Sequence, residues 1–142
     1  RKQGRGVFAV ITGIAHVCYL VSDLDASVAF YAQKLGLTPA FDFRNDAGER
    51  TGIYLHVGGR NFVELFQGAP AARDDAQSYR HLCLEVDNMK DTLTALRAQG
   101  VESTEMELGG DGAWQAWITD PDGNRIELHQ YTDASLQNAH LS

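Results

Sequence analysis

The chain has 142 residues, of which 44% are apolar and 22% are charged, and its formal net charge is −7. A chain of this size buries about 70% of the surface that it exposes when unfolded, so it suits one compact domain. The negative charge argues against a nucleic-acid or membrane partner, and no apolar run approaches the roughly 20 residues of a membrane-spanning helix.

The N-terminal stretch RKQGRG is basic, and no apolar segment long enough for a signal peptide follows it. Two cysteines, Cys18 and Cys83, are too few for a disulfide framework. We therefore expect a cytoplasmic protein. Because the first residue is not Met, we also expect that the natural N-terminus lies upstream.

The first half of the chain predicts a strand, a helix and then three strands. Residues 24–35 place apolar side chains at i, i+4 and i+7, which is one stripe of an amphipathic helix. Ser22 or Asp23 suits its N-cap, and Gly36 stands where it should end. The expected strands cover residues 12–21, 38–44, 51–58 and 60–67.

The second half predicts the same order of elements. A helix is expected at 89–99, with Asp87 or Asn88 as N-cap and Gly100 at its end. The expected strands cover residues 79–87, 101–108, 113–119 and 124–131. We therefore predict one domain over 1–142, with module 1 at 12–67, a linker at 68–78 and module 2 at 79–131. The polar tail at 132–142 is expected to be disordered or to pack on a partner.

The two halves also repeat in sequence. NFVELFQ (61–67) and NRIELHQ (124–130) are identical at four of seven positions, and AHVCYLV (15–21) aligns with RHLCLEV (80–86). This alignment places His16 over His81, Cys18 over Cys83 and Glu64 over Glu127. A chance match of one short strand would not extend to its surroundings, so the repeat indicates duplicated modules.

The repeated histidines and glutamates predict a metal site. Both faces of strand 12–21 are largely apolar, so we expect the strand to be buried on both sides. A buried carboxylate costs several kcal/mol unless a partner or a metal compensates. A lone strand histidine is more often a core residue and a lone glutamate more often faces solvent, but the doubled register favours ligands. We predict that one divalent transition metal ion is bound by two histidines and two glutamates, His16, Glu64, His81 and Glu127.

Other side chains near the predicted site have weaker signals. His129 shares the face of Glu127 and suits either a proton shuttle or a place at the rim of the site. Trp114 and Trp117 lie on opposite faces of one strand, so only one of them can line a cavity. The two cysteines are expected to be small packing residues.

These motifs resemble the vicinal oxygen chelate superfamily, which includes glyoxalase I, methylmalonyl-CoA epimerase, extradiol dioxygenases and bleomycin resistance proteins. The resemblance covers about residues 12–131. It implies an α+β fold, with two tandem βαβββ modules that form a curved open sheet around a metal-binding cavity, and it usually implies a homodimer.

The ligand set resembles that of bacterial glyoxalase I, which uses His, Glu, His and Glu. The resemblance implies one divalent ion per site (Ni, Zn, Co, Mn or Fe). It also implies an arginine four residues after the first histidine to hold glutathione, but this chain has Leu20 there. Arg44, Arg50 and Arg125 are the arginines that could replace it.

The resemblance implies an isomerase or lyase that acts on a small α-oxygenated carbonyl compound. The expected reaction is proton abstraction beside a carbonyl, with a metal-stabilised enediolate. Glu127 is the preferred base and Glu64 the second choice, while Arg125 and His129 are candidates for substrate binding. The alternatives are an acyl epimerase, an Fe(II) dioxygenase and a non-catalytic small-molecule-binding resistance protein.

Overall fold

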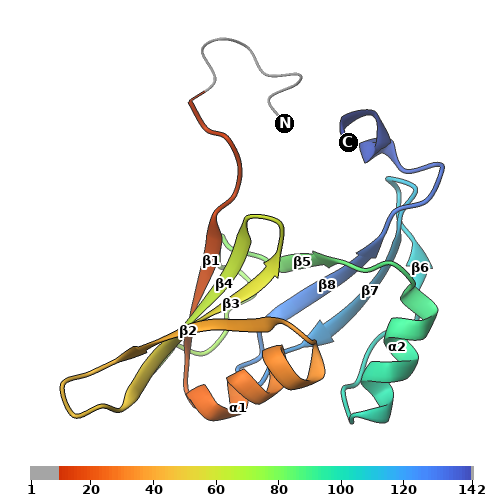
Figure 1. Cartoon of the computed structure of the whole chain (residues 1–142). Helices are drawn as coiled ribbons and strands as arrows, with labels where there is room; N and C mark the ends of the chain where they lie inside the picture. The colour runs from red at the N-terminus through yellow and green to blue at the C-terminus, as the bar shows by residue number, and fades with distance from the viewer. Residues whose placement is uncertain (1–9, 142) are drawn as a thin grey trace.

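The computed structural model describes residues 10–141, so the basic stretch at 1–6 lies outside the described residues (Figure 1). The protein consists of two four-stranded mixed sheets, each built by one half of the chain, and a few short helices. This architecture confirms the predicted α+β class and the two modules. The first sheet has the order β1-β4-β3-β2 and the second has the order β5-β8-β7-β6. Their strands are β1 (His16–Val21), β2 (Thr38–Arg44), β3 (Arg50–Gly58), β4 (Asn61–Gln67), β5 (Leu82–Glu85), β6 (Glu107–Leu108), β7 (Trp114–Thr119) and β8 (Arg125–Gln130).

The repeated motifs form the same parallel strand pair in each sheet. β1 runs parallel to β4 with Cys18 opposite Glu64, and β5 runs parallel to β8 with Cys83 opposite Glu127. The sequence repeat is therefore also a repeat of register.

Each module carries one helical segment after its first strand. In module 1, α1 (Leu24–Val28) starts at Asp23, whose carboxylate accepts a hydrogen bond from the Ala26 amide at 3.1 Å. It continues as the π-helix η1 (Ala29–Lys34), so only the first part of the expected helix has α geometry. In module 2, α2 (Met89–Ala98) is capped by Asn88.

Several predicted strand limits were wrong. β1 and β5 start later than expected, and β6 has two residues instead of the predicted 101–108. The expectation that the first strand is buried on both sides was also wrong. Tyr19 and Val21 are buried, whereas His16, Cys18 and Leu20 are exposed, because only one face of β1 packs against the core.

The C-terminal tail packs on its own chain as far as it is described. Its 3-10 helix, η2 (Leu136–His140), is held by the loop between β6 and β7. The Leu136 amide donates to the Asp111 carbonyl at 2.8 Å, and the Gln137 amide donates to the Asp111 carboxylate at 2.7 Å. The expected disorder is therefore wrong for these residues.

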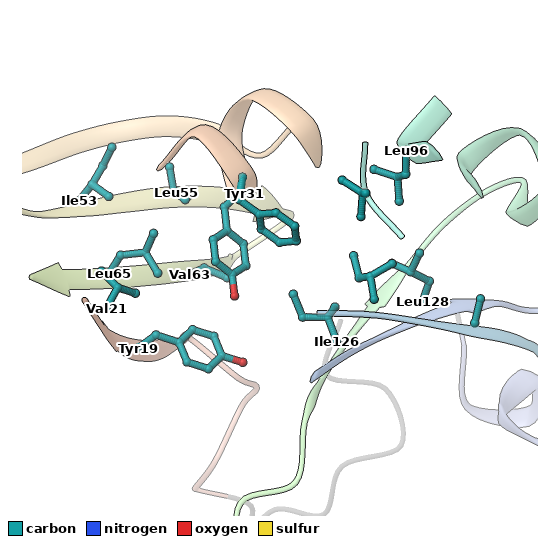
Figure 2. Close-up of a cluster of buried hydrophobic side chains, with 14 of the residues drawn as sticks. Tyr19, Val21, Tyr31, Ile53, Leu55, Val63, Leu65, Leu96, Ile126 and Leu128 are labelled. Carbon is teal, nitrogen blue, oxygen red and sulfur yellow. The ribbon is translucent and has the colours of Figure 1, made fainter. Parts of the chain in front are cut away.

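One hydrophobic core joins the two halves. Figure 2 shows side chains of the first sheet, such as Leu65, facing Ile126 and Leu128 of the second, with Tyr31 between them. The buried Tyr31 hydroxyl also donates to Asp120 of module 2 at 2.7 Å. Because side chains alternate along a strand, the opposite face of each sheet points away from this shared core. Among the described residues, no helix is long and apolar enough to cross a membrane.

Candidate metal centre

In module 1 the predicted ligands lie side by side. His16 Nε2 is 3.2 Å from Glu64 Oε1, and the glutamate side chain is only 14% exposed. The other ring nitrogen of His16, Nδ1, lies 3.0 Å from the Tyr54 hydroxyl. Burial and the charge of Glu64 raise the pKa of Tyr54, so the hydroxyl stays neutral and can accept an Nδ1 proton. This contact would leave Nε2 free to bind a metal.

Module 2 repeats the pair with different surroundings. His81 Nε2 lies 3.2 Å from Glu127 Oε1, and the Glu127 side chain is 12% exposed. The His81 ring lies nearly perpendicular to the Trp117 ring, at a centroid distance of 4.7 Å. Trp114 lies on the other side of β7 and packs against the core, so Trp117 is the tryptophan on the site face. Arg125 stacks over Trp117 at 4.2 Å and is exposed.

The spacing within each pair suits two neighbouring metal ligands. With metal–ligand distances of about 2.1 Å, adjacent N and O ligands are separated by about 3.0 Å in an octahedral site and about 3.4 Å in a tetrahedral site. The 3.2 Å separations observed in both pairs fall between these values. The geometry of each pair is therefore compatible with two neighbouring ligands of one ion.

The two pairs do not meet within the chain. Among the described residues, Cys83, Glu127 and His129 bring three potential ligand atoms within 4.8 Å of one another. This group contains only one of the four predicted ligands, Glu127. A cavity of about 540 Å³ between the β3–β4 turn and β5 includes Cys83 and Phe62, but none of the four predicted ligands lines it. The reason is that both pairs occupy the sheet faces that point away from the shared core.

His129 lies between Glu127 and an aspartate that the sequence did not indicate. His129 Nδ1 is 3.5 Å from Glu127 Oε2, and its Nε2 is 3.6 Å from Asp111 Oδ2. The hydrogen bond from Gln137 and one from the Ala113 amide lower the pKa of Asp111, so it is ionised at neutral pH. Asp111 belongs to a loop outside the repeat, so periodicity carried no signal for it.

The two cysteines lie on the site faces and are exposed, so they are not the small packing residues that the sequence suggested. Cys83 Sγ lies 3.5 Å from His129 Nδ1. Desolvation by surrounding protein atoms and the charge of Glu127 raise the pKa of Cys83 to about 12. The pKa of Cys18 is raised by desolvation and by Glu64. Both thiols are therefore protonated at neutral pH.

Aromatic rings surround the pair of module 1. Phe41 stacks on Tyr54 at 4.7 Å, and Phe62 contacts the same tyrosine at 5.3 Å. Phe43 packs on Phe66 at 5.1 Å. We call these five residues the aromatic wall. Phe41 remains 51% exposed, so the wall has apolar surface free to contact a ligand.

Comparison with known proteins gives a consistent result. The model of the Glyoxalase/Bleomycin resistance protein/Dioxygenase superfamily matches residues 13–128. A probable lactoylglutathione lyase from Vibrio parahaemolyticus is 30% identical, over 86% of this chain and 93% of that protein. The crystal structure of SMU.1112c is similar with a TM-score of 0.76 and 27% identity, over 84% of this chain and 98% of that chain. TnmS3, an antibiotic binding protein from Streptomyces sp. CB03234, has a TM-score of 0.71 and 25% identity, over 87% of this chain and 99% of that chain.

Proposed function

Because the chain belongs to the Glyoxalase/Bleomycin resistance protein/Dioxygenase superfamily, we propose that it is a metal-dependent isomerase or lyase of the glyoxalase I type. The observation that carries this proposal is the doubled His–Glu pair, with the same 3.2 Å spacing in both modules. The similarity to a probable lactoylglutathione lyase supports the same reaction class. The substrate is a small compound with a carbonyl beside another oxygen-bearing carbon.

We propose that a complete site needs two chains. His16 and Glu64 of one chain would face His81 and Glu127 of a second copy, because the shared core directs the two pairs of a single chain away from each other. The resulting set of two imidazoles and two carboxylates suits Ni, Zn, Co, Mn or Fe. The protein is therefore a homodimer with two equivalent sites.

A divalent ion held by His16, Glu64, His81 and Glu127 would supply Lewis-acid stabilisation for the negative charge that develops on the substrate. Glu127 takes the proton beside the carbonyl and returns it to the neighbouring carbon. Its Oε2, which faces His129 rather than His81, is the oxygen available for this work. His129 holds the carboxylate in place, and Glu64 is the second candidate for the base.

The residues around the pairs argue against a glutathione adduct as the preferred substrate. Leu20 occupies the position of the glutathione-binding arginine and is 48% exposed. Arg44 and Arg50 are paired with Asp42 and Asp25, both at 2.8 Å. A missing charge-assisted contact costs roughly 1.5–3 kcal/mol, or about 10- to 100-fold in binding. The aromatic wall instead favours a substrate with an apolar, planar part.

The aromatic wall also supports a second candidate function, which is binding of an aromatic small molecule without catalysis. The similarity to TnmS3, an antibiotic binding protein, supports this alternative. A binder would not need the His–Glu pairs, so its ligand affinity should not depend on a divalent ion. Ligand affinity measured with and without a divalent ion therefore distinguishes the two functions.

The test begins with metal analysis of the wild-type protein and of His81→Ala after loading with Mn²⁺, which favours carboxylate ligands over thiolates. We expect about one ion per chain in the wild type and a large loss in His81→Ala, because the variant lacks one of four ligands. Full occupancy in the variant would remove His81 from the ligand set.

The loaded protein is then assayed with the methylglyoxal–glutathione adduct and with other α-oxygenated carbonyl compounds, including aryl compounds. We expect turnover of a compound without glutathione and poor turnover of the adduct. A kcat/KM for the adduct above about 10⁶ M⁻¹s⁻¹, within the efficient range of enzymes, would show that Leu20 does not exclude glutathione. Metal-independent binding of aryl compounds with no turnover would favour the binder.

A further inference from the structure

The strongest unassigned feature of the molecule is a group of three potential ligands beside the His81–Glu127 pair. Cys83 Sγ, Glu127 Oε2 and His129 Nδ1 come from β5 and β8 and point to the same side of the second sheet. Their ligand atoms all lie within 4.8 Å of one another. They combine a sulfur, an oxygen and a nitrogen donor, which is a set that borderline and soft divalent ions accept.

Two of the three separations match the edges of a tetrahedral site. With zinc–ligand distances of about 2.3 Å to sulfur and about 2.1 Å to nitrogen and oxygen, tetrahedral angles give edges of about 3.6 Å for S···N and about 3.4 Å for N···O. The observed distances are 3.5 Å from Cys83 Sγ to His129 Nδ1 and 3.5 Å from His129 Nδ1 to Glu127 Oε2. The third separation, from Cys83 Sγ to the Glu127 carboxylate, is at most 4.8 Å, so the three side chains can converge on one ion.

The surroundings also suit this arrangement. The His129 side chain is 11% exposed, and its Nε2 is a buried atom without a hydrogen-bond partner, 3.6 Å from the Asp111 carboxylate. An ion on Nδ1 fixes the proton on Nε2, which then points toward Asp111, in the manner of carboxylate–histidine–metal triads. The exposed Cys83 leaves a path for the ion to enter.

The two oxygens of Glu127 face different partners. Oε1 lies toward His81 at 3.2 Å and Oε2 lies toward His129 at 3.5 Å. One carboxylate can therefore serve two neighbouring ions, with one oxygen for each. Module 1 offers no such site, because Phe66 stands at the position equivalent to His129, although Cys18 and Glu64 are both present.

We propose that Cys83, Glu127 and His129 form a second metal site, which takes a thiophilic divalent ion such as zinc, cobalt or cadmium and shares Glu127 with the His81 pair. Binding replaces the Cys83 S–H bond by a metal–sulfur bond and releases the proton to solvent. The site uses residues of a single chain, so it does not depend on the proposed function. If Glu127 is the catalytic base, an ion here occupies Oε2 and inhibits turnover.

The experiment is an anaerobic titration of the full chain with Co²⁺, in which thiolate coordination produces near-ultraviolet sulfur-to-cobalt charge transfer. We expect this absorption in the wild type and its loss in Cys83→Ser. Cys18→Ser is the matched control, because it removes the equivalent thiol of the module that lacks the histidine, and it should keep the absorption. The variant His129→Phe, which copies Phe66, should weaken cobalt binding at this site at least 10-fold, because losing a ligand costs no less than losing a partner that only orients one.

His81→Ala separates this proposal from the proposed function. It should lose the ion held by the two His–Glu pairs and still show the thiolate absorption. Absence of charge transfer in the wild type, or its persistence in Cys83→Ser, would show that Cys83 only hydrogen-bonds His129. Loss of the absorption in Cys18→Ser would move the site to the other module and equally overturn the proposal.

Discussion

Tyr54 is the residue that most directly orients His16 in the proposed metal site. Its hydroxyl lies 3.0 Å from His16 Nδ1, while His16 Nε2 faces Glu64. A hydrogen bond to the second nitrogen of a ligating histidine fixes the tautomer and the direction of the ring. No sequence pattern indicated Tyr54, since this contact joins β3 to β1, which are separated in the sheet by β4.

We predict that Tyr54→Phe lowers metal affinity about 10- to 100-fold. This is the usual effect of removing the hydrogen-bond partner of a ligating histidine. The measurement is a competition titration with a chelating dye. Tyr79→Phe is a suitable control, because the Tyr79 hydroxyl contacts Tyr19 at 2.8 Å and lies outside the pairs. Equal affinities for the two variants would show that Tyr54 does not support His16.

At the scale of elements, the repeated motif has a structural role beside its glutamate. The motif ends in Gln67 in module 1 and in Gln130 in module 2. The Gln67 side chain accepts a hydrogen bond from the Leu24 amide at 2.8 Å, and Gln130 accepts one from the Met89 amide at 2.6 Å. Each glutamine therefore satisfies a free amide at the start of its module's helix and ties that helix to the strand that carries the glutamate.

We predict that Gln130→Ala lowers the free energy of unfolding by about 1–3 kcal/mol, because a partly buried Met89 amide loses its acceptor. Urea denaturation measures the change. Gln99→Ala near the other end of α2 should change stability by less than about 0.5 kcal/mol, since Gln99 is exposed and its side chain makes one long bond of 3.3 Å. If the two variants lose the same stability, the glutamine contact is not what holds the helix.

At the scale of the whole molecule, the shared core decides how a site can be completed. Tyr31 and Leu65 of module 1 belong to the same buried cluster as Ile126 and Leu128 of module 2. The faces with the His–Glu pairs are therefore left open on opposite sides of this cluster. In the proposed dimer, each open face with its partly buried carboxylate would meet the complementary pair of the second copy.

A two-chain site predicts complementation between inactive variants. His16→Ala and His81→Ala should each lose metal as pure proteins. When they are mixed and their subunits exchange, each mixed dimer holds one site with all four ligands. Random exchange in an equal mixture should recover about a quarter of the wild-type metal capacity. Sedimentation checks that the species is a dimer.

The control for this experiment is a mixture of His81→Ala with Glu127→Ala, whose defects fall in the same half-site, so no mixed dimer has a complete site. Recovery in that mixture, or no recovery in the first one, would contradict a site shared between chains. A sedimentation profile with only the 15.6 kDa chain would contradict it as well.

The contents of each module could be predicted from the sequence alone. Hydrophobic periodicity and turn residues predicted the order of elements, and the repeat paired His16 with Glu64 and His81 with Glu127. These features were accessible because they depend on local spacing and on the register of one parallel strand pair. The same reasoning failed for strand ends and for the burial of β1. An apolar residue pattern does not show which face of a strand another element will cover.

The groups that surround the pairs, and the direction in which the pairs face, depend on long-range packing. Asp111 approaches His129 from a loop, and Tyr54 reaches His16 across the sheet. The relation between the halves depends on packing between segments far apart in sequence, such as Tyr31 against Asp120. Alternation along a strand fixes which side chains share a face, but long-range burial of apolar surface decides which of the two faces becomes the core and which is left for chemistry.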